Sequence, residues 1–193
     1  MSRLAFLTFL AVVSLSLGGF TTEPGPNTWP GWRGPASAGS ATSGAYASGW
    51  SDGKNILWKA PLPGKGCSTP VVWGESIFIT VPIEGEDAVM AFDWKGKVRW
   101  RSRMGKARGG KHRNGSGANP SPVTDGKYIF VYYRSGNFAG LDIDGKVLWK
   151  TNLQERFGQD TLYWDIGTSP VVTEAHAVIA VIQERGSFLA AFD

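Results

Sequence analysis

Three stretches of this chain have similar sequences, and they recur about every 50 residues. Each stretch opens with a Pro-Val dipeptide, passes through short apolar runs, and ends with an apolar residue followed by aspartate. The opening prolines and closing aspartates are Pro70, Pro122, Pro170, Asp93, Asp142 and Asp193. A period of this length, filled with short runs of β-forming residues, is typical of a β-propeller, in which similar sheets repeat around an axis.

The first copy is interpreted as four strands, which cover residues 70–73, 77–81, 88–92 and 98–101. The second copy has the same order with sharper turns, because Asp-Gly pairs at 125–126 and 144–145 separate its apolar runs, as in β-hairpins. The third copy reaches only its third strand. The sequence therefore predicts an all-β chain of four-stranded antiparallel blades, with two complete blades, a partial third and an incomplete ring. No amphipathic helix is expected after the N-terminal segment.

One short segment stands apart from the three copies. Asn55–Lys59 reads NILWK and is similar to Lys146–Lys150, which reads KVLWK and ends the second copy. No earlier strands precede it, so we interpret it as a lone fourth strand that would complete the sheet of the last blade and close the ring. Since that blade is absent here, we expect the strand to have no proper partner. A chance match within a loop is the alternative.

Residues 1–20 have the pattern of a secretory signal peptide. Arg3 provides the positive charge, Leu4–Leu17 is mostly apolar, and small residues follow at Ser16 and Gly18. The protein is therefore predicted to be exported, to the periplasm or the extracellular space, with no membrane span after cleavage. An uncleaved membrane anchor is the alternative.

Residues 21–54 are rich in Gly, Pro and Ser and precede the repeats, which we assign to 55–193. Within this segment, residues 29–35 read WPGWRGP. Two tryptophans around an arginine do not suit a flexible tether, so we expect both rings to pack on the propeller body beside Arg33.

The composition of 26 Gly, 11 Pro and 9 Trp suits a protein with many tight turns and a docking aromatic ring in each blade. We assign Trp58, Trp100 and Trp149 to this docking role. The aspartates Asp93, Asp142 and Asp193 end strands before turns, and the first two are expected to cap these turns by accepting backbone N–H bonds. Cys67 is the only cysteine, which excludes an internal disulfide, and its place before a strand predicts a partly buried thiol.

The most unusual charge pattern runs from Lys97 to Arg113, which holds eight Lys or Arg residues and no acidic residue. Its second half is a Gly-rich loop between blades. The candidate residues for an anionic ligand are Arg108, Lys111, His112 and Arg113. A solvated basic loop is the alternative, and nucleic acid is disfavoured by the export signal. The sequence shows no zinc-ligand spacing and no nucleophile–histidine–acid set.

The chain resembles the pyrroloquinoline-quinone-like (PQQ-like) β-propeller repeat proteins, particularly the secreted bacterial members of the planctomycete type. The resemblance rests on the WPGWRGP opening, the NILWK segment, Ser169-Pro170-Val171, and Asp-x-x-Gly-Lys-x-x-Trp at 93–100 and 142–149. It covers residues 28–193. It implies a propeller fold, interrupted here before the ring is complete, and by itself it specifies no activity.

The resemblance also implies what an enzyme of this family would contain. The quinoprotein dehydrogenases bind PQQ and Ca²⁺, use a catalytic aspartate, and carry a Thr before the Gly-Lys of each repeat. Here both turns are one residue shorter, only one cysteine is present, and the two complete copies show no clustered calcium ligands.

The favoured interpretation is therefore a non-catalytic scaffold or binding module without a cofactor. Its partner would be a protein or a polysaccharide. One alternative is a fragment of a PQQ-dependent quinoprotein dehydrogenase. Another is a protein that binds carbohydrate or an anionic polymer. Since three blades cannot close a ring, self-association of the chain is also expected.

Overall fold

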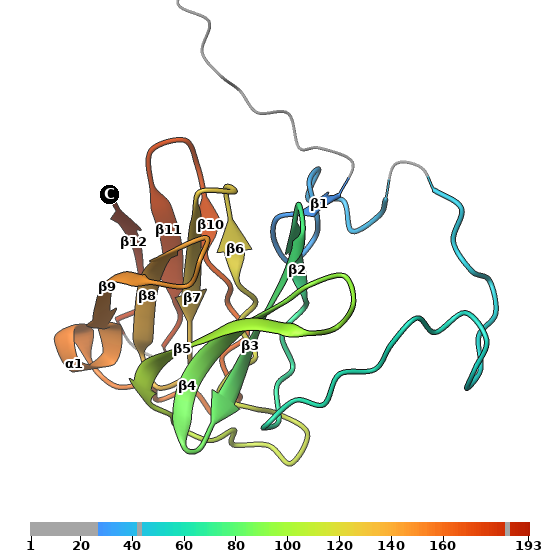
Figure 1. Cartoon of the computed structure of the whole chain (residues 1–193). Helices are drawn as coiled ribbons and strands as arrows, with labels where there is room; N and C mark the ends of the chain where they lie inside the picture. The colour runs from blue at the N-terminus through green and yellow to red at the C-terminus, as the bar shows by residue number, and fades with distance from the viewer. Residues whose placement is uncertain (1–26, 42–43, 184–185) are drawn as a thin grey trace, which may run out of the picture.

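The computed structural model describes residues 27–41, 44–183 and 186–193, so the predicted signal peptide at 1–20 lies outside the described residues. The described chain folds into three antiparallel sheets of five, four and three strands (Figure 1). The first sheet contains β1 (Thr28–Trp29), β2 (Val71–Trp73), β3 (Ser76–Ile83), β4 (Glu86–Phe92) and β5 (Val98–Lys106). The second contains β6 (Val123–Thr124), β7 (Tyr128–Tyr132), β8 (Asn137–Asp142) and β9 (Val147–Asn152). The third contains β10 (Val171–Val172), β11 (Ala177–Val181) and β12 (Phe188–Phe192).

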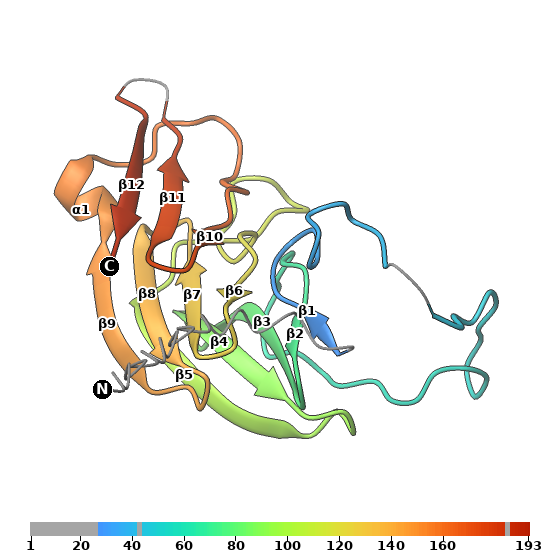
Figure 2. The same ribbon diagram turned by 90° about the horizontal axis from the view of Figure 1, so that it is seen from above.

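The three sheets stand next to one another in chain order and do not close into a ring (Figure 2). Their first strands meet, because β6 contacts both β2 and β10. Each sheet is a meander in which consecutive strands pair. The predicted all-β fold is therefore confirmed, including a third sheet that stops at its third strand.

Strand β7 shows how the sequence positions the second sheet between the other two. Ile129 and Val131 belong to the apolar core shared with the first sheet, whereas Phe130 and Tyr132 belong to the core shared with the third. Because successive side chains of a strand point to opposite faces, an uninterrupted apolar run supplies both cores at once. The run is therefore apolar throughout rather than alternating.

The N-terminal segment joins the first sheet in a way that the sequence did not predict. Thr28–Trp29 forms β1, which pairs with β2, so this sheet has five strands rather than four. Trp32 remains 62% exposed, with the Arg33 guanidinium 5.6 Å from its ring, so the predicted packing of this ring on the body is wrong. The attachment comes from backbone pairing at Trp29.

Two further expectations require correction. Asn55–Lys59 is not a strand; instead the indole N–H of Trp58 donates to the backbone carbonyl of Trp94 at 2.8 Å. This hydrogen bond and the contact of the Trp58 ring with Gly96 hold the segment against the first sheet without strand pairing, and no partner was expected for it in this chain. Cys67 is exposed rather than partly buried, because it precedes β2 by several residues and its Sγ lies 3.3 Å from the Asn114 carbonyl oxygen.

A short helix, α1 (Leu153–Phe157), follows β9, although no helix was expected. Asn152 caps its N-terminus, because the side-chain oxygen accepts the N–H groups of Gln154 and Glu155, both at 3.0 Å. Five residues are too few to show a helical period in sequence. Within the described residues, no helix has the length and apolar character needed to cross a membrane.

Candidate functional site

The repeat aspartates cap turns. Asp93 Oδ1 accepts the N–H groups of Lys95 and Lys97, each at 2.9 Å, and the bond from Lys97 is the main reason that the pKa of Asp93 lies below its usual range. Asp142 Oδ1 accepts from Asp144 at 3.1 Å and Lys146 at 2.8 Å. The predicted capping role of both is confirmed. Asp193 instead pairs with a histidine, as described below.

The repeat tryptophans each pack against a glycine, and for Trp100 this glycine lies in a turn of the following sheet. A methyl group placed on Gly145 would lie 2.4 Å from the Trp100 ring, so only glycine allows this approach. Trp58 covers Gly96 in the same way. Trp149 lies against Gly140 of its own sheet and stacks on Phe192 of β12, with 5.8 Å between ring centroids. The predicted docking between neighbouring blades is thus confirmed for Trp100.

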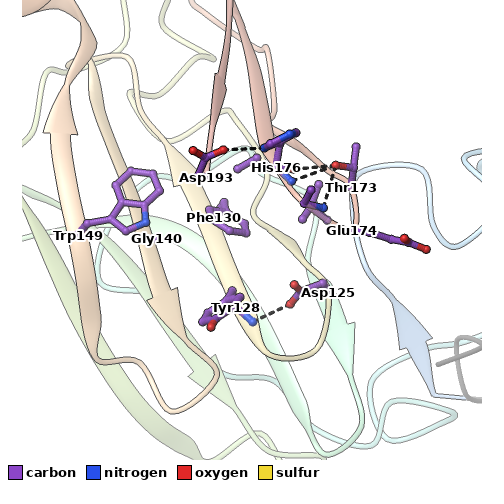
Figure 3. A pocket seen from close by; sticks show the side chains of 12 residues that line it. Asp125, Tyr128, Phe130, Gly140, Trp149, Thr173, Glu174, His176 and Asp193 are labelled. Carbon is purple, nitrogen blue, oxygen red and sulfur yellow. Dashed lines mark hydrogen bonds and ion pairs between the residues drawn. The ribbon is translucent and has the colours of Figure 1, made fainter. Parts of the chain in front are cut away.

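A cleft of about 290 Å³ lies between the second and third sheets (Figure 3). Its aromatic lining consists of Tyr128, Phe130 and Trp149. At its edge, His176 Nδ1 lies 2.9 Å from Asp193 Oδ1, but the Asp193 side chain is 97% exposed, so water screens this pair. The neighbouring Thr173 hydroxyl bonds the backbone of His176 rather than its ring. The cleft is therefore an aromatic crevice without an activated nucleophile.

A buried cluster of charged side chains lies at the end of the sheets where the two connections between blades, residues 107–122 and 153–170, meet. Arg134, in the turn between β7 and β8, is buried and lies between two carboxylates. Its Nε is 3.6 Å from Asp160 Oδ2 and 3.4 Å from Asp165 Oδ1. The same guanidinium donates to the Gly109 carbonyl, so one side chain connects residues 107–122 with residues 153–170.

The carboxylates also bind the basic loop directly. Asp165 accepts the backbone N–H groups of Lys111 at 2.6 Å and His112 at 3.1 Å. Burial alone would raise the pKa of Asp165, but these bonds and the positive charges of Arg134 and Lys111 outweigh it and lower the pKa. Lys111 Nζ lies 3.1 Å from Asp160 Oδ2. The two positive and two negative groups of this cluster therefore compensate one another.

The four residues predicted for an anionic ligand do not converge. Lys111 is paired with Asp160, and His112 binds Asp165 through its backbone. Arg113 is exposed, and its carbonyl accepts a bond from Lys65. Arg108 lines a polar pocket on the described part of the chain.

That pocket has a volume of about 340 Å³. Its lining side chains are all polar and come from the loop after β5, the β7–β8 turn, the end of β9, and α1 with the residues after it. They are Arg108, Ser135, Asn152, Gln154, Glu155 and Gln159. We refer to this site as the polar pocket.

Behind the polar pocket, Asp87 connects the first two sheets. Its Oδ2 accepts bonds from the Ser135 hydroxyl and, at 2.9 Å, from Asn137 Nδ2, while its Oδ1 is buried without a partner in the described structure. Asp87 is 0% exposed, and this burial raises its pKa to about 6 against the opposing effect of both hydrogen bonds.

We expect Asp87→Asn to remove a pH dependence of stability. The folded-state pKa of Asp87 lies above the value of about 4 in an unfolded chain, so the contribution of Asp87 to stability falls as pH rises from about 4 to 6 and is level above that. Between pH 4.5 and pH 7 the loss is about 2 kcal/mol. Urea unfolding of both proteins at these two pH values measures it, with exposed Asp144→Asn as the matched control. Equal pH dependence in wild type and Asp87→Asn would show that this carboxylate does not titrate in the range.

Sequence reasoning missed Arg134, Asp160 and Asp165, although they organise the loop that it singled out. It also missed Tyr163 and Trp164, which form an edge-to-face pair with 4.8 Å between centroids and are 76% and 67% exposed. The sequence signal that could have found them is an aromatic pair with an aspartate on either side. This pair lies in the connection at 153–170, between the second and third sheets, whereas the basic loop lies in the corresponding connection at 107–122, between the first and second sheets. Adjacent exposed aromatics in a polar loop favour a contact surface.

The comparison with protein families matches residues 38–193 to the family described as outer membrane protein assembly factor BamB. The chain belongs to this family of PQQ-like β-propeller repeats. No curated protein matches it.

Several solved structures match part of the chain at low sequence identity. Quinohemoprotein alcohol dehydrogenase ADHIIG from Pseudomonas putida HK5 is 20% identical, with a TM-score of 0.49 over 70% of this chain and 20% of that one. The quinohemoprotein alcohol dehydrogenase from Comamonas testosteroni is 19% identical, with a TM-score of 0.45 over 68% and 20%. BamB from Moraxella catarrhalis is 20% identical, with a TM-score of 0.35 over 54% and 25%. The chain thus spans a quarter or less of the length of these proteins.

Proposed function

We propose that this PQQ-like repeat chain acts as a non-catalytic binding module of an exported protein. The main observation in favour is the buried cluster around Arg134, which fixes both connections between blades against one another. A rigid frame with prearranged loops lowers the ordering cost of binding a partner. The signal-peptide pattern at residues 1–20 supports export to the periplasm or beyond.

The side chains near the two connections between blades are better suited to binding a partner than to catalysing a reaction. The carboxylates of Asp160 and Asp165 are already engaged by cationic groups and backbone N–H donors. The exposed Tyr163 and Trp164 and the exposed Arg113 surround them with contact groups of the kind that bind a protein or a polysaccharide.

The alternative of a quinoprotein dehydrogenase requires a site for PQQ and Ca²⁺, and the residues present do not fit one. In residues 27–41, 44–183 and 186–193, no three His, Cys, Asp or Glu side chains are placed to share a metal ion. The single Cys67 gives no adjacent pair, and the shortened repeat turns depart from the enzyme pattern. We therefore derive no quinone step for this chain.

The test of this proposal is to mix the purified protein with PQQ and Ca²⁺ and to record both the absorbance of bound quinone and dye-linked alcohol oxidation. We expect neither binding nor turnover, because no three His, Cys, Asp or Glu side chains of the described residues are placed to share the metal ion. Omitting Ca²⁺ provides the matched control for free quinone. Stoichiometric, calcium-dependent binding or turnover would establish the enzyme alternative instead.

A second candidate function, carbohydrate binding, is favoured by one specific observation. The polar pocket is lined by side chains that can donate and accept hydrogen bonds, and none of them is apolar.

A further inference from the structure

We infer that the polar pocket binds a neutral sugar residue of a glycan. This inference rests on the binding function proposed above and names the class of ligand. The pocket volume of about 340 Å³ falls within the range of small-molecule sites. Three chain segments far apart in sequence, at 108, 135 and 152–159, build it together.

The floor of the pocket is held in place by hydrogen bonds. Asn152 Nδ2 donates to the Ser135 carbonyl at 3.2 Å and to Asn137 Oδ1 at 3.1 Å. Gln154 is buried, and its Nε2 donates to the Arg134 carbonyl at 2.7 Å. The floor side chains are therefore preorganised, and their positions do not depend on a ligand.

The rim retains groups that can bind a ligand. Arg108 uses one guanidinium nitrogen to donate to Gln154 Oε1 at 3.1 Å, which leaves other N–H groups of its fork available. Glu155 and Gln159 are exposed, and in the described structure no hydrogen bond or ion pair occupies their side chains. Together the rim offers a cationic donor, an anionic acceptor and an amide with both functions. A sugar ring, whose hydroxyls both donate and accept, matches this mixed set.

The charges of the pocket argue against other ligand classes. A phosphate or sulfate would approach the carboxylate of Glu155 as well as the guanidinium of Arg108, and the nearby charges of Lys111 and Arg134 are already paired. An apolar or aromatic side chain of a peptide would need apolar contact area, which the side chains of this lining do not provide. A metal ion would find one carboxylate, where calcium takes six or more oxygen ligands. A neutral polyhydroxyl ring matches this mixed set of donors and acceptors best.

The experiment is a calorimetric titration of the full chain with cellotetraose, mannotetraose, xylotetraose and chitotetraose, followed by the corresponding monosaccharides. We expect at least one tetrasaccharide to bind with a Kd tighter than about 1 mM. Weaker binding of the monosaccharide would identify a glycan chain as the ligand, and equal binding would identify a free sugar. Binding should change less than about twofold between 50 and 500 mM salt, because no net charge is neutralised.

The double variant Glu155→Ala/Gln159→Ala should weaken this binding at least tenfold. Both side chains are exposed, so the fold should be preserved, as thermal unfolding would verify. Glu174→Ala, at the aromatic cleft between the second and third sheets, is the matched control and should bind as the wild type does.

Three results would overturn the inference: no binding by any of the four tetrasaccharides, unchanged binding by the double variant, or competition by inorganic sulfate. The last of these would favour an anionic ligand. Because PQQ with Ca²⁺ is titrated in parallel, the two proposals fail separately. A negative sugar titration with inert PQQ contradicts only the sugar, whereas PQQ binding contradicts the non-catalytic module.

Discussion

Replacing Arg134 by alanine should lower the free energy of unfolding by about 3–5 kcal/mol, because two carboxylates lose their buried cationic partner. The side chains of Asp160 and Asp165 are 1% and 7% exposed, so water cannot replace the guanidinium without rearrangement. The substitution also removes the donor to the Gly109 carbonyl. Urea unfolding monitored by tryptophan fluorescence measures the loss. The loop at 107–117 should also become more sensitive to protease.

Arg101→Ala is the matched control for this experiment. Arg101 is exposed on β5, and its truncation should change stability by less than about 0.5 kcal/mol. If Arg134→Ala costs less than about 1 kcal/mol, the cluster does not hold the two connections together. In that case the two connections are not held rigidly against one another, and the main support for the proposed function is lost.

Trp100→Ala should cost about 3–5 kcal/mol, because it leaves a cavity between the first two sheets. The ring lies on Gly145 of the second sheet and 5.8 Å from Phe78 of the first, so its removal exposes apolar surface on both. Differential scanning calorimetry is the appropriate measurement, since the same change should lower Tm clearly in a chain of this size.

Trp50→Ala provides the comparison, because Trp50 is 71% exposed and belongs to none of the three apolar cores. Its loss should be below about 0.5 kcal/mol. Equal effects of the two substitutions would mean that the repeat tryptophan makes no contribution as an inter-sheet contact.

The features that could be predicted from sequence are those that repeat or act locally. Asp93 and Asp142 were assigned correctly because turn capping needs only the neighbouring backbone. Helix α1 was missed because a single capped turn leaves no periodic pattern. The Asn55–Lys59 segment was misassigned because its sequence resembles a strand, while strand formation requires a partner that no described segment provides.

The candidate site was harder to predict, because its electrostatics come from residues far apart in the chain. The loop around Lys111 reads as strongly basic, but Asp160 and Asp165, about 50 residues later, neutralise much of it. Arg134 lies in an ordinary hairpin turn and has no distinguishing local sequence. The formal charge of this segment therefore predicted a basic loop correctly. It could not predict which of the positive side chains are free to bind a ligand, because that depends on acidic residues elsewhere in the chain.

Hydrogen–deuterium exchange of the full chain, with and without the tetrasaccharide that binds, tests most directly whether the polar pocket is the binding site. We expect slower exchange in peptides that cover 104–117, 133–137 and 150–160, which surround the polar pocket. Peptides that cover 125–130 and 172–177, at the aromatic cleft, should be unchanged. Protection confined to the aromatic cleft, or no protection in either region, would contradict the assignment of the binding face.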